Sequence, residues 1–120
     1  MRVSVTSLLE EPQHYGEPAP GAVCAAAGSV ARACAVQFSA QSAADGLREV
    51  RYQAFGGPEL IAACEFVAGQ ASTRAAEDIG GATDWLAALG LPREALATLF
   101  VVEDAWRGLV TASISNDKGD

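Results

Sequence analysis

Hydrophobic positions change their spacing at Gly56-Gly57, and the change divides the chain into two kinds of predicted structure. Before it, apolar residues alternate with polar ones or form short β-branched runs, which is typical of strands. After it, they recur every three or four residues, which is typical of helices with one buried face. Strands followed by helices form an α+β arrangement. We therefore predict a small antiparallel sheet followed by helices packed on one of its faces.

The predicted sheet contains two or three strands. Val30–Ser39 carries β-branched and aromatic residues, and Leu47–Phe55 alternates between apolar and polar. Gln41–Gly46 is a polar connection that ends in Asp-Gly, so these two strands are expected to form a hairpin. Ala22–Ala27 is small and apolar, with a turn expected after it at Gly28-Ser29. Whether this segment pairs as a third strand is left open by the sequence.

Helices are predicted on both sides of the sheet segment. A short one ends before Pro12, because proline disfavours helical geometry in the residue before it, and Pro58 suits the first position of another. The predicted helices are Thr6–Glu11, Pro58 to about Gly69, Ser72–Ile79, a segment capped at Thr83-Asp84 that runs to Gly90, and Arg93 to about Ile114. Residues 1–114 are then a single domain, and 115–120 are a polar C-terminal tail.

Composition and charge limit the classes of partner. The 120 residues, half of them hydrophobic, supply one domain with one core. A net charge of −7 and a pI near 4.5 repel phosphate backbones and anionic lipid, so neither nucleic acid nor a membrane surface is an expected partner. The opening Met1–Ser4 lacks the basic start and apolar run of a signal peptide, and no apolar window has the length of a membrane span. We expect a cytoplasmic protein.

The three cysteines are expected to be reduced thiols. Cys24, Cys34 and Cys64 form no CxxC pair, and an odd number does not suit a disulfide framework. Cys64 lies on the apolar stripe of its predicted helix, where a thiol packs as a small hydrophobe. His14 is a lone histidine in a loop, and we interpret it as an ordinary surface residue.

Four segments resemble one family of scaffold proteins. They are Leu9–Gly16, similar to a Tyr-x-Asn-Pro-x-Asn-x-Gly segment; Ala26–Ser29, where the family has Ala-Cys-Gly-Asp; Val50–Gly56, similar to the strand that enters a Tyr-Gly-Cys turn; and Glu103–Ala105, which matches a Glu-Asp-Ala triplet in the last helix. Over about residues 8 to 114 the chain thus resembles the IscU/NifU-like (SufU-like) iron-sulfur cluster assembly scaffolds. The resemblance implies the IscU/NifU N-terminal-like fold.

The same resemblance implies that the ligands of the cluster are lost. Where the family has its ligand cysteines, the aspartate close to the metal and the His-Cys pair of the last helix, this chain has Ala27, Ser29, Gly57, Ala97 and Thr98. Iron and zinc in such sites need thiolate or imidazole donors, and accepting a persulfide needs a thiolate nucleophile. We therefore expect no cofactor where the family would bind an iron-sulfur cluster or zinc.

Of the remaining cysteines, Cys24 lies three residues before Ala27 and is expected to be the one nearest to the lost site. It is the one candidate for a relocated metal ligand. No catalytic motif such as GxSxG, HExxH or a phosphate-binding loop is present, so the sequence predicts no enzyme. Adjacent carboxylates at Glu103-Asp104 diverge on a helix, and we interpret them as a solvated face.

Two classes of function follow. The resemblance implies a degenerate scaffold that acts through protein contacts as a modulator of iron-sulfur assembly, with a cysteine desulfurase or another assembly protein as partner. The alternative is a structural or interaction module outside that pathway. If helices cover the alanine face of Val30–Ser39, then Val36 and Phe38 on its other face are free to meet a partner or a second copy. Metal binding near Cys24 is a third hypothesis.

Overall fold

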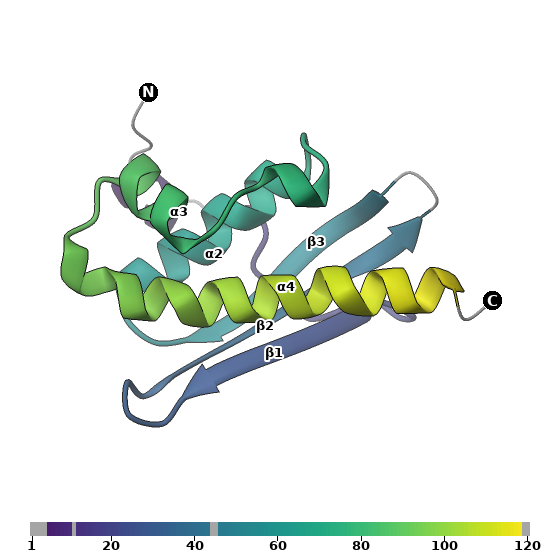
Figure 1. Ribbon diagram of the computed structural model, residues 1–120, viewed down its shortest axis with the longest axis horizontal. Coiled ribbons are helices and arrows are strands. Elements are labelled where there is room, and N and C mark those ends of the chain that lie inside the picture. The colour runs from purple at the N-terminus through teal and green to yellow at the C-terminus, as the bar shows by residue number, and fades with distance from the viewer. Residues whose placement is uncertain (1–4, 11, 44–45, 119–120) are drawn as a thin grey trace.

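The protein is a two-layer structure, with an antiparallel sheet on one side and helices on the other (Figure 1). The structure is a computed structural model and describes residues 5–10, 12–43 and 46–118. Three strands, β1 (Val23–Ser29), β2 (Cys34–Ala43) and β3 (Gly46–Phe55), pair antiparallel in the order β1-β2-β3. The predicted α+β class is confirmed, and the segment that the sequence left open is the third strand.

The turn between β1 and β2 comes later than predicted. Val30–Ala33, expected to begin a strand, forms the turn, and Ala33 has a left-handed φ of 50°. The Ser29 hydroxyl accepts a hydrogen bond from the Arg32 backbone N–H, at 3.3 Å, and this local bond favours a turn over continued pairing. At the other end β2 continues to Ala43, so residues 41–43 belong to the strand and not to the connection, while residues 44 and 45 lie outside the described residues.

A segment near the N-terminus adds to the other edge of the sheet. Tyr15 forms a parallel bridge with Tyr52 of β3. The Tyr52 N–H donates to the His14 carbonyl at 3.1 Å, and the Gly16 N–H donates to the Tyr52 carbonyl at 2.9 Å. The outer edge of β3 is therefore partly paired by residues that lie far from it in sequence.

The helices largely follow the predicted segments. They are α1 (Val5–Glu10), α2 (Pro58–Ala71), α3 (Ala82–Leu89) and α4 (Leu96–Lys118), with 3-10 turns η1 (Ala76–Asp78) and η2 (Arg93–Ala95). The helix predicted over Ser72–Ile79 is only the 3-10 turn η1. Glycine at position 90 takes a left-handed φ of 63° and ends α3. Because α4 continues to Lys118, the first four residues of the expected polar tail are helical.

The core lies between the sheet and the two long helices, α2 and α4. Phe38 and Val36 of β2 are fully buried there, and the Phe38 ring meets Trp106 of α4 edge-on, with centroids 5.5 Å apart. The condition for an open Val36 and Phe38 face is not met, because the helices cover this face and not the alanine face, and Ala35 stays exposed. Alternation predicts which residues share a face, but it does not say which face the helices choose. Among the described helices, none has the length and apolar character of a membrane span.

Candidate functional site

One end of the sheet brings together residues from three distant parts of the chain. A pocket of about 420 Å³ lies there, and its lining comes from the β1–β2 turn, β2, the start of α2 and the first turn of α4. The lining residues are Ala31, Arg32, Cys34, Gly57, Glu59 and Thr98. Two of them, Gly57 and Thr98, stand where the resemblance aligns ligands of the cluster. These two positions are 41 residues apart in sequence, so the pocket depends on the fold.

The other three of the five aligned positions lie near this pocket or face away from it. Ser29 ends β1 directly opposite Cys34. Ala27 pairs with Val36 and packs against the core on the helix side of the sheet. Ala97 is half-buried in the first turn of α4 and does not line the pocket. The fold thus brings Gly57 and Thr98 together at one pocket, while the Ala27 side chain packs against the core.

Cys34, and not Cys24, is the cysteine of this pocket. Cys34 is 8 % exposed and lines it, next to Ser29 on the neighbouring strand. Cys24 lies opposite Ser39, five residues along β1 from Ser29, which at strand spacing is roughly 17 Å away. The expectation that Cys24 is nearest was wrong, because an extended strand carries near neighbours in sequence far apart, whereas the tight turn returns Cys34 to the end of β1.

The local backbone at the start of α2 determines which side chains this pocket can accept. Gly57 is the N-cap of α2 with an ordinary φ of −75°, and Pro58 follows at the first helical position. A Cβ on Gly57 would meet only the flexible Glu59 carboxylate, at 3.0 Å. Gly56, by contrast, has a φ of 156°, and a Cβ there would lie 2.5 Å from a Leu60 methyl group. A side chain is therefore tolerable at 57 and strained at 56.

The polar groups around the pocket do not make a metal site. The Cys34 thiol and the Glu59 carboxylate are its potential donors to a metal, and structural zinc sites use four ligands. Across the part of the chain that the structure describes, no three His, Cys, Asp or Glu side chains are grouped to hold a metal ion. The pocket holds one thiol, one carboxylate, one hydroxyl and one guanidinium, which can bind a polar side chain of a partner.

A second cluster that sequence reasoning missed joins the N-terminal segment to α2. Glu65 is a buried carboxylate, and its Oε2 lies 2.5 Å from Nδ1 of His14. The His14 backbone N–H donates to the other carboxylate oxygen at 3.0 Å, and the Tyr52 hydroxyl donates to the same oxygen at 3.1 Å. Burial, reinforced by the Glu65 charge, raises the pKa of Tyr52 well above its usual range.

This cluster corrects the interpretation of His14 as an ordinary surface residue. The histidine lies 51 residues from its carboxylate partner, so no local pattern could indicate the pair. One signal was present: Glu65 lies four residues after Ile61 and three before Ala68, on the inward stripe of α2. A carboxylate at such a position needs buried donors, and the 14–16 segment and Tyr52 provide them. The cluster holds the N-terminal segment in place.

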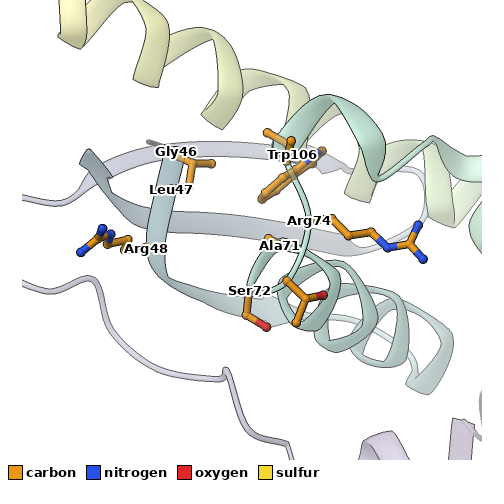
Figure 2. A pocket seen from close by; sticks show the side chains of 10 residues that line it. Gly46, Leu47, Arg48, Ala71, Ser72, Arg74 and Trp106 are labelled. Atoms are coloured by element: carbon orange, nitrogen blue, oxygen red, sulfur yellow. The ribbon is translucent and has the colours of Figure 1, made fainter. Parts of the chain in front are cut away.

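The pocket in Figure 2 lies between the start of β3, the end of α2 and Trp106 of α4. Its volume is about 370 Å³. The Arg48 and Arg74 side chains point in opposite directions, away from the space between them (Figure 2). The Ser72 hydroxyl turns back to the Gly69 carbonyl at 2.7 Å, near the end of α2. Polar groups do not converge in this pocket, and we assign it no function.

Glu103 is not simply part of a solvated face. Its Oε1 accepts a 2.7 Å hydrogen bond from the Ala82 N–H at the first position of α3, and its Oε2 lies 3.5 Å from Arg107. Asp104 beside it is exposed, as expected for a solvated face.

The chain matches no protein-family model, and no curated protein shows significant similarity to it.

Proposed function

We propose that this chain is a degenerate scaffold of the IscU/NifU type, which modulates iron-sulfur cluster assembly through protein contacts without building clusters. The observation that supports this most is the pocket at the end of the sheet. Gly57 and Thr98, which the resemblance aligns with two ligand positions, come from different helices and line the same space. A chance alignment of two positions 41 residues apart would not be expected to select two that line the same pocket.

The chemistry of the pocket supports the loss of cluster building. A hydrogen atom at Gly57 and a hydroxyl at Thr98 are not donors for iron, and Cys34 supplies a single thiol. What the pocket keeps is a polar rim formed by Arg32 and Glu59 around a mostly buried thiol. Such a surface suits a protein contact, and the net charge of −7 favours a basic partner surface.

The partner expected first is a cysteine desulfurase. We expect isothermal titration calorimetry to detect binding of the purified chain to a cysteine desulfurase, and added chain to slow cluster assembly on an intact scaffold protein by competition. A double variant with Arg32→Glu and Glu59→Lys should weaken both effects, because it reverses both charges of the rim. Glu10→Lys, on exposed α1, is the matched control. No binding at about 100 μM and no effect on assembly would contradict the proposal.

A second experiment tests whether the aligned positions 57 and 98 form one site, by placing metal-binding thiols at both. After anaerobic treatment with iron and sulfide, the wild type is expected to hold no cluster. Gly57→Cys combined with Thr98→Cys places two thiols beside Cys34 and the Glu59 carboxylate, which is a donor set that zinc accepts. We expect the double variant to bind about one Zn²⁺ or Co²⁺ per chain, with thiolate-to-cobalt absorption as the readout.

Serine substitutions at Cys34 and at Cys24 show which native cysteine binds the metal in the double variant. Cys34→Ser in the double variant should abolish cobalt binding, whereas Cys24→Ser should leave it unchanged, because Cys24 lies far along β1. Circular dichroism confirms that each variant is folded. A folded double variant that takes up no metal would show that the two aligned positions do not form one site, and a cluster in the wild type would overturn the degenerate-scaffold proposal itself.

A further inference from the structure

The outer edge of β1 lacks the features that keep strand edges from pairing. β1 is the end strand of the order β1-β2-β3, and no described residue outside the sheet forms a backbone hydrogen bond with Val23–Ser29. The edge strands of natural sheets usually carry charges, prolines or bulges, because their unpaired N–H and C=O groups can otherwise hydrogen-bond to a strand of another chain. β1 contains no charged residue and no proline, and it pairs with β2 over all seven residues without a register shift.

The two edges of the sheet therefore differ. Residues 14–16 pair with the outer edge of β3 through two backbone hydrogen bonds. β1 has no equivalent segment among the described residues. We propose that β1 pairs antiparallel with β1 of a second copy, so that two chains form one six-stranded sheet around a two-fold axis.

The sequence of β1 is self-complementary in this arrangement. With Ala26 opposite its own counterpart, Cys24 lies opposite Gly28 and Ala25 lies opposite Ala27. Residues with exposed side chains then stay on the open face of both copies, and those packed against the core stay on the helix face. β1 itself brings no charged residue to the axis, although the chain carries a net charge of −7. A C2 contact of this kind uses the same surface on both copies.

The exposed stripe of the helix above β1 is centred close to the same axis. Gly108 of α4 lies over Ala25, because a Cβ on Gly108 would come within 3.1 Å of the Ala25 Cβ. As α4 runs opposite to β1 (Figure 1), Ala26 lies under a point about two residues before Gly108, from the rise per residue of a strand and a helix. The exposed stripe of α4 is Phe100, Asp104, Arg107, Thr111 and Ile114, and its midpoint, residue 107, lies within about one residue of that point.

Antiparallel pairing of α4 about this centre joins complementary groups. Phe100 of each copy meets Ile114 of the other, and these two side chains are 46 % and 52 % exposed in the isolated chain. In the same register Arg107 lies at the centre, opposite its own counterpart, and Asp104 of each copy, opposite Val110 of the other, lies within one helical turn of both Arg107 side chains. Strands are spaced by about 4.8 Å, so a helix above β1 and β2 lies about 5 Å from the axis, and the two helices are roughly 10 Å apart, close to the usual packing distance.

These features favour a second copy over a foreign strand as the occupant. A foreign peptide would need only the free edge of β1. The coincidence between the centre of β1 and the centre of the α4 stripe is expected only for a partner with the same two elements in the same arrangement. The inference does not depend on the proposed function, because no residue that lines the pocket belongs to β1 or to the exposed stripe of α4.

Introducing a charged side chain at Ala26 tests whether the dimer forms through β1. Ala26 is exposed and lies on the axis, so Ala26→Lys or Ala26→Glu places two like charges directly opposite each other. By analytical ultracentrifugation of the whole chain, we expect a wild-type dimer at micromolar concentration and a dissociation constant raised at least about tenfold in each variant. Mixing the two variants should restore the dimer, since Lys then faces Glu.

Ala35→Lys is the control, because Ala35 is exposed on the same face but lies on the central strand. It should leave the dissociation constant unchanged. If the Ala26 variants are misfolded by circular dichroism, oxidation of a Cys24→Ser, Ala26→Cys chain decides instead, with a disulfide-linked dimer expected there and none in Cys24→Ser, Ala35→Cys. A wild type that stays monomeric at about 500 μM, or a dimer insensitive to both charges at 26, overturns the proposal.

Discussion

Glu65 is a buried carboxylate whose hydrogen-bond donors come mostly from the N-terminal segment. It is almost fully buried on α2, and its donors are the two nitrogen groups of His14 and the Tyr52 hydroxyl. These contacts connect the segment 14–16, β3 and α2 through one side chain. The same contacts place Tyr15 against Tyr52, with ring centroids 5.4 Å apart. Glu65 thus reinforces the two backbone hydrogen bonds by which the segment covers the outer edge of β3.

Replacing Glu65 by alanine should be among the most destabilising substitutions in the chain. It leaves the His14 and Tyr52 donors without their acceptor, and losing one partner of a buried charged hydrogen-bond network costs about 2–4 kcal/mol. Urea unfolding measures the change in free energy. Glu94→Ala, at an exposed position, should change it by less than about 0.5 kcal/mol. Equal effects of the two substitutions would show that the cluster contributes nothing specific.

At the scale of elements, the sequence predicted most helices and strands but misplaced the turn between β1 and β2. Val30 favoured a strand by its side chain, yet it is fully exposed in the turn, because the Ser29 hydroxyl and the left-handed Ala33 reverse the chain there. The expected helix at Ser72–Ile79 shortened to η1 for a related reason. The Ser72 and Thr73 hydroxyls bond to carbonyls at the end of α2 and so prolong its final turn instead of capping a new helix.

The start of α3 offers a prediction at this scale. Gly81 is its N-cap and has no side chain, so the Glu103 carboxylate of α4 takes part in capping by accepting from the Ala82 N–H. Removing it in Glu103→Ala should cost about 1 kcal/mol, the usual value of a lost cap, and loosen α3 against α4. Urea unfolding and amide hydrogen exchange at 82–84 measure both effects. Glu94→Ala, at an exposed carboxylate just before α4, should change neither, and a comparable loss there would indicate a general charge effect.

For the whole molecule, the sequence predicts a layered fold but not which side of the sheet the helices cover. Phe38 and Ala35 lie on opposite faces of β2, as alternation requires, and only the packing of α2 and α4 decides that Phe38 is buried. The pocket was likewise only half predictable. Gly57 and Thr98 were identified through a resemblance, whereas Cys34 joined them because of a turn that begins one residue after Ser29.

The layered core also determines how the stability of the whole molecule depends on pH. Burial raises the pKa of the Cys64 thiol, and burial together with the Glu65 charge raises the pKa of Tyr52. Both groups keep their protons in the folded chain at pH values where the unfolded chain loses them. Above about pH 9, where a free thiol ionises, the unfolded state therefore binds fewer protons, and the free energy of unfolding must fall as pH rises.

We expect this fall to approach about 1.4 kcal/mol per pH unit for each of the two groups once the unfolded group is ionised. Urea unfolding at pH 7 and at pH 10.5 measures it. Cys64→Ala and Tyr52→Phe should each lower stability at pH 7, yet each should reduce the loss on going to pH 10.5. Cys24→Ser and Tyr15→Phe replace exposed groups of the same chemistry and should leave that loss as in the wild type. If the exposed pair flattened the pH dependence as much as the buried pair, ionisation on unfolding would not be its origin, and repulsion within the acidic chain would explain it instead.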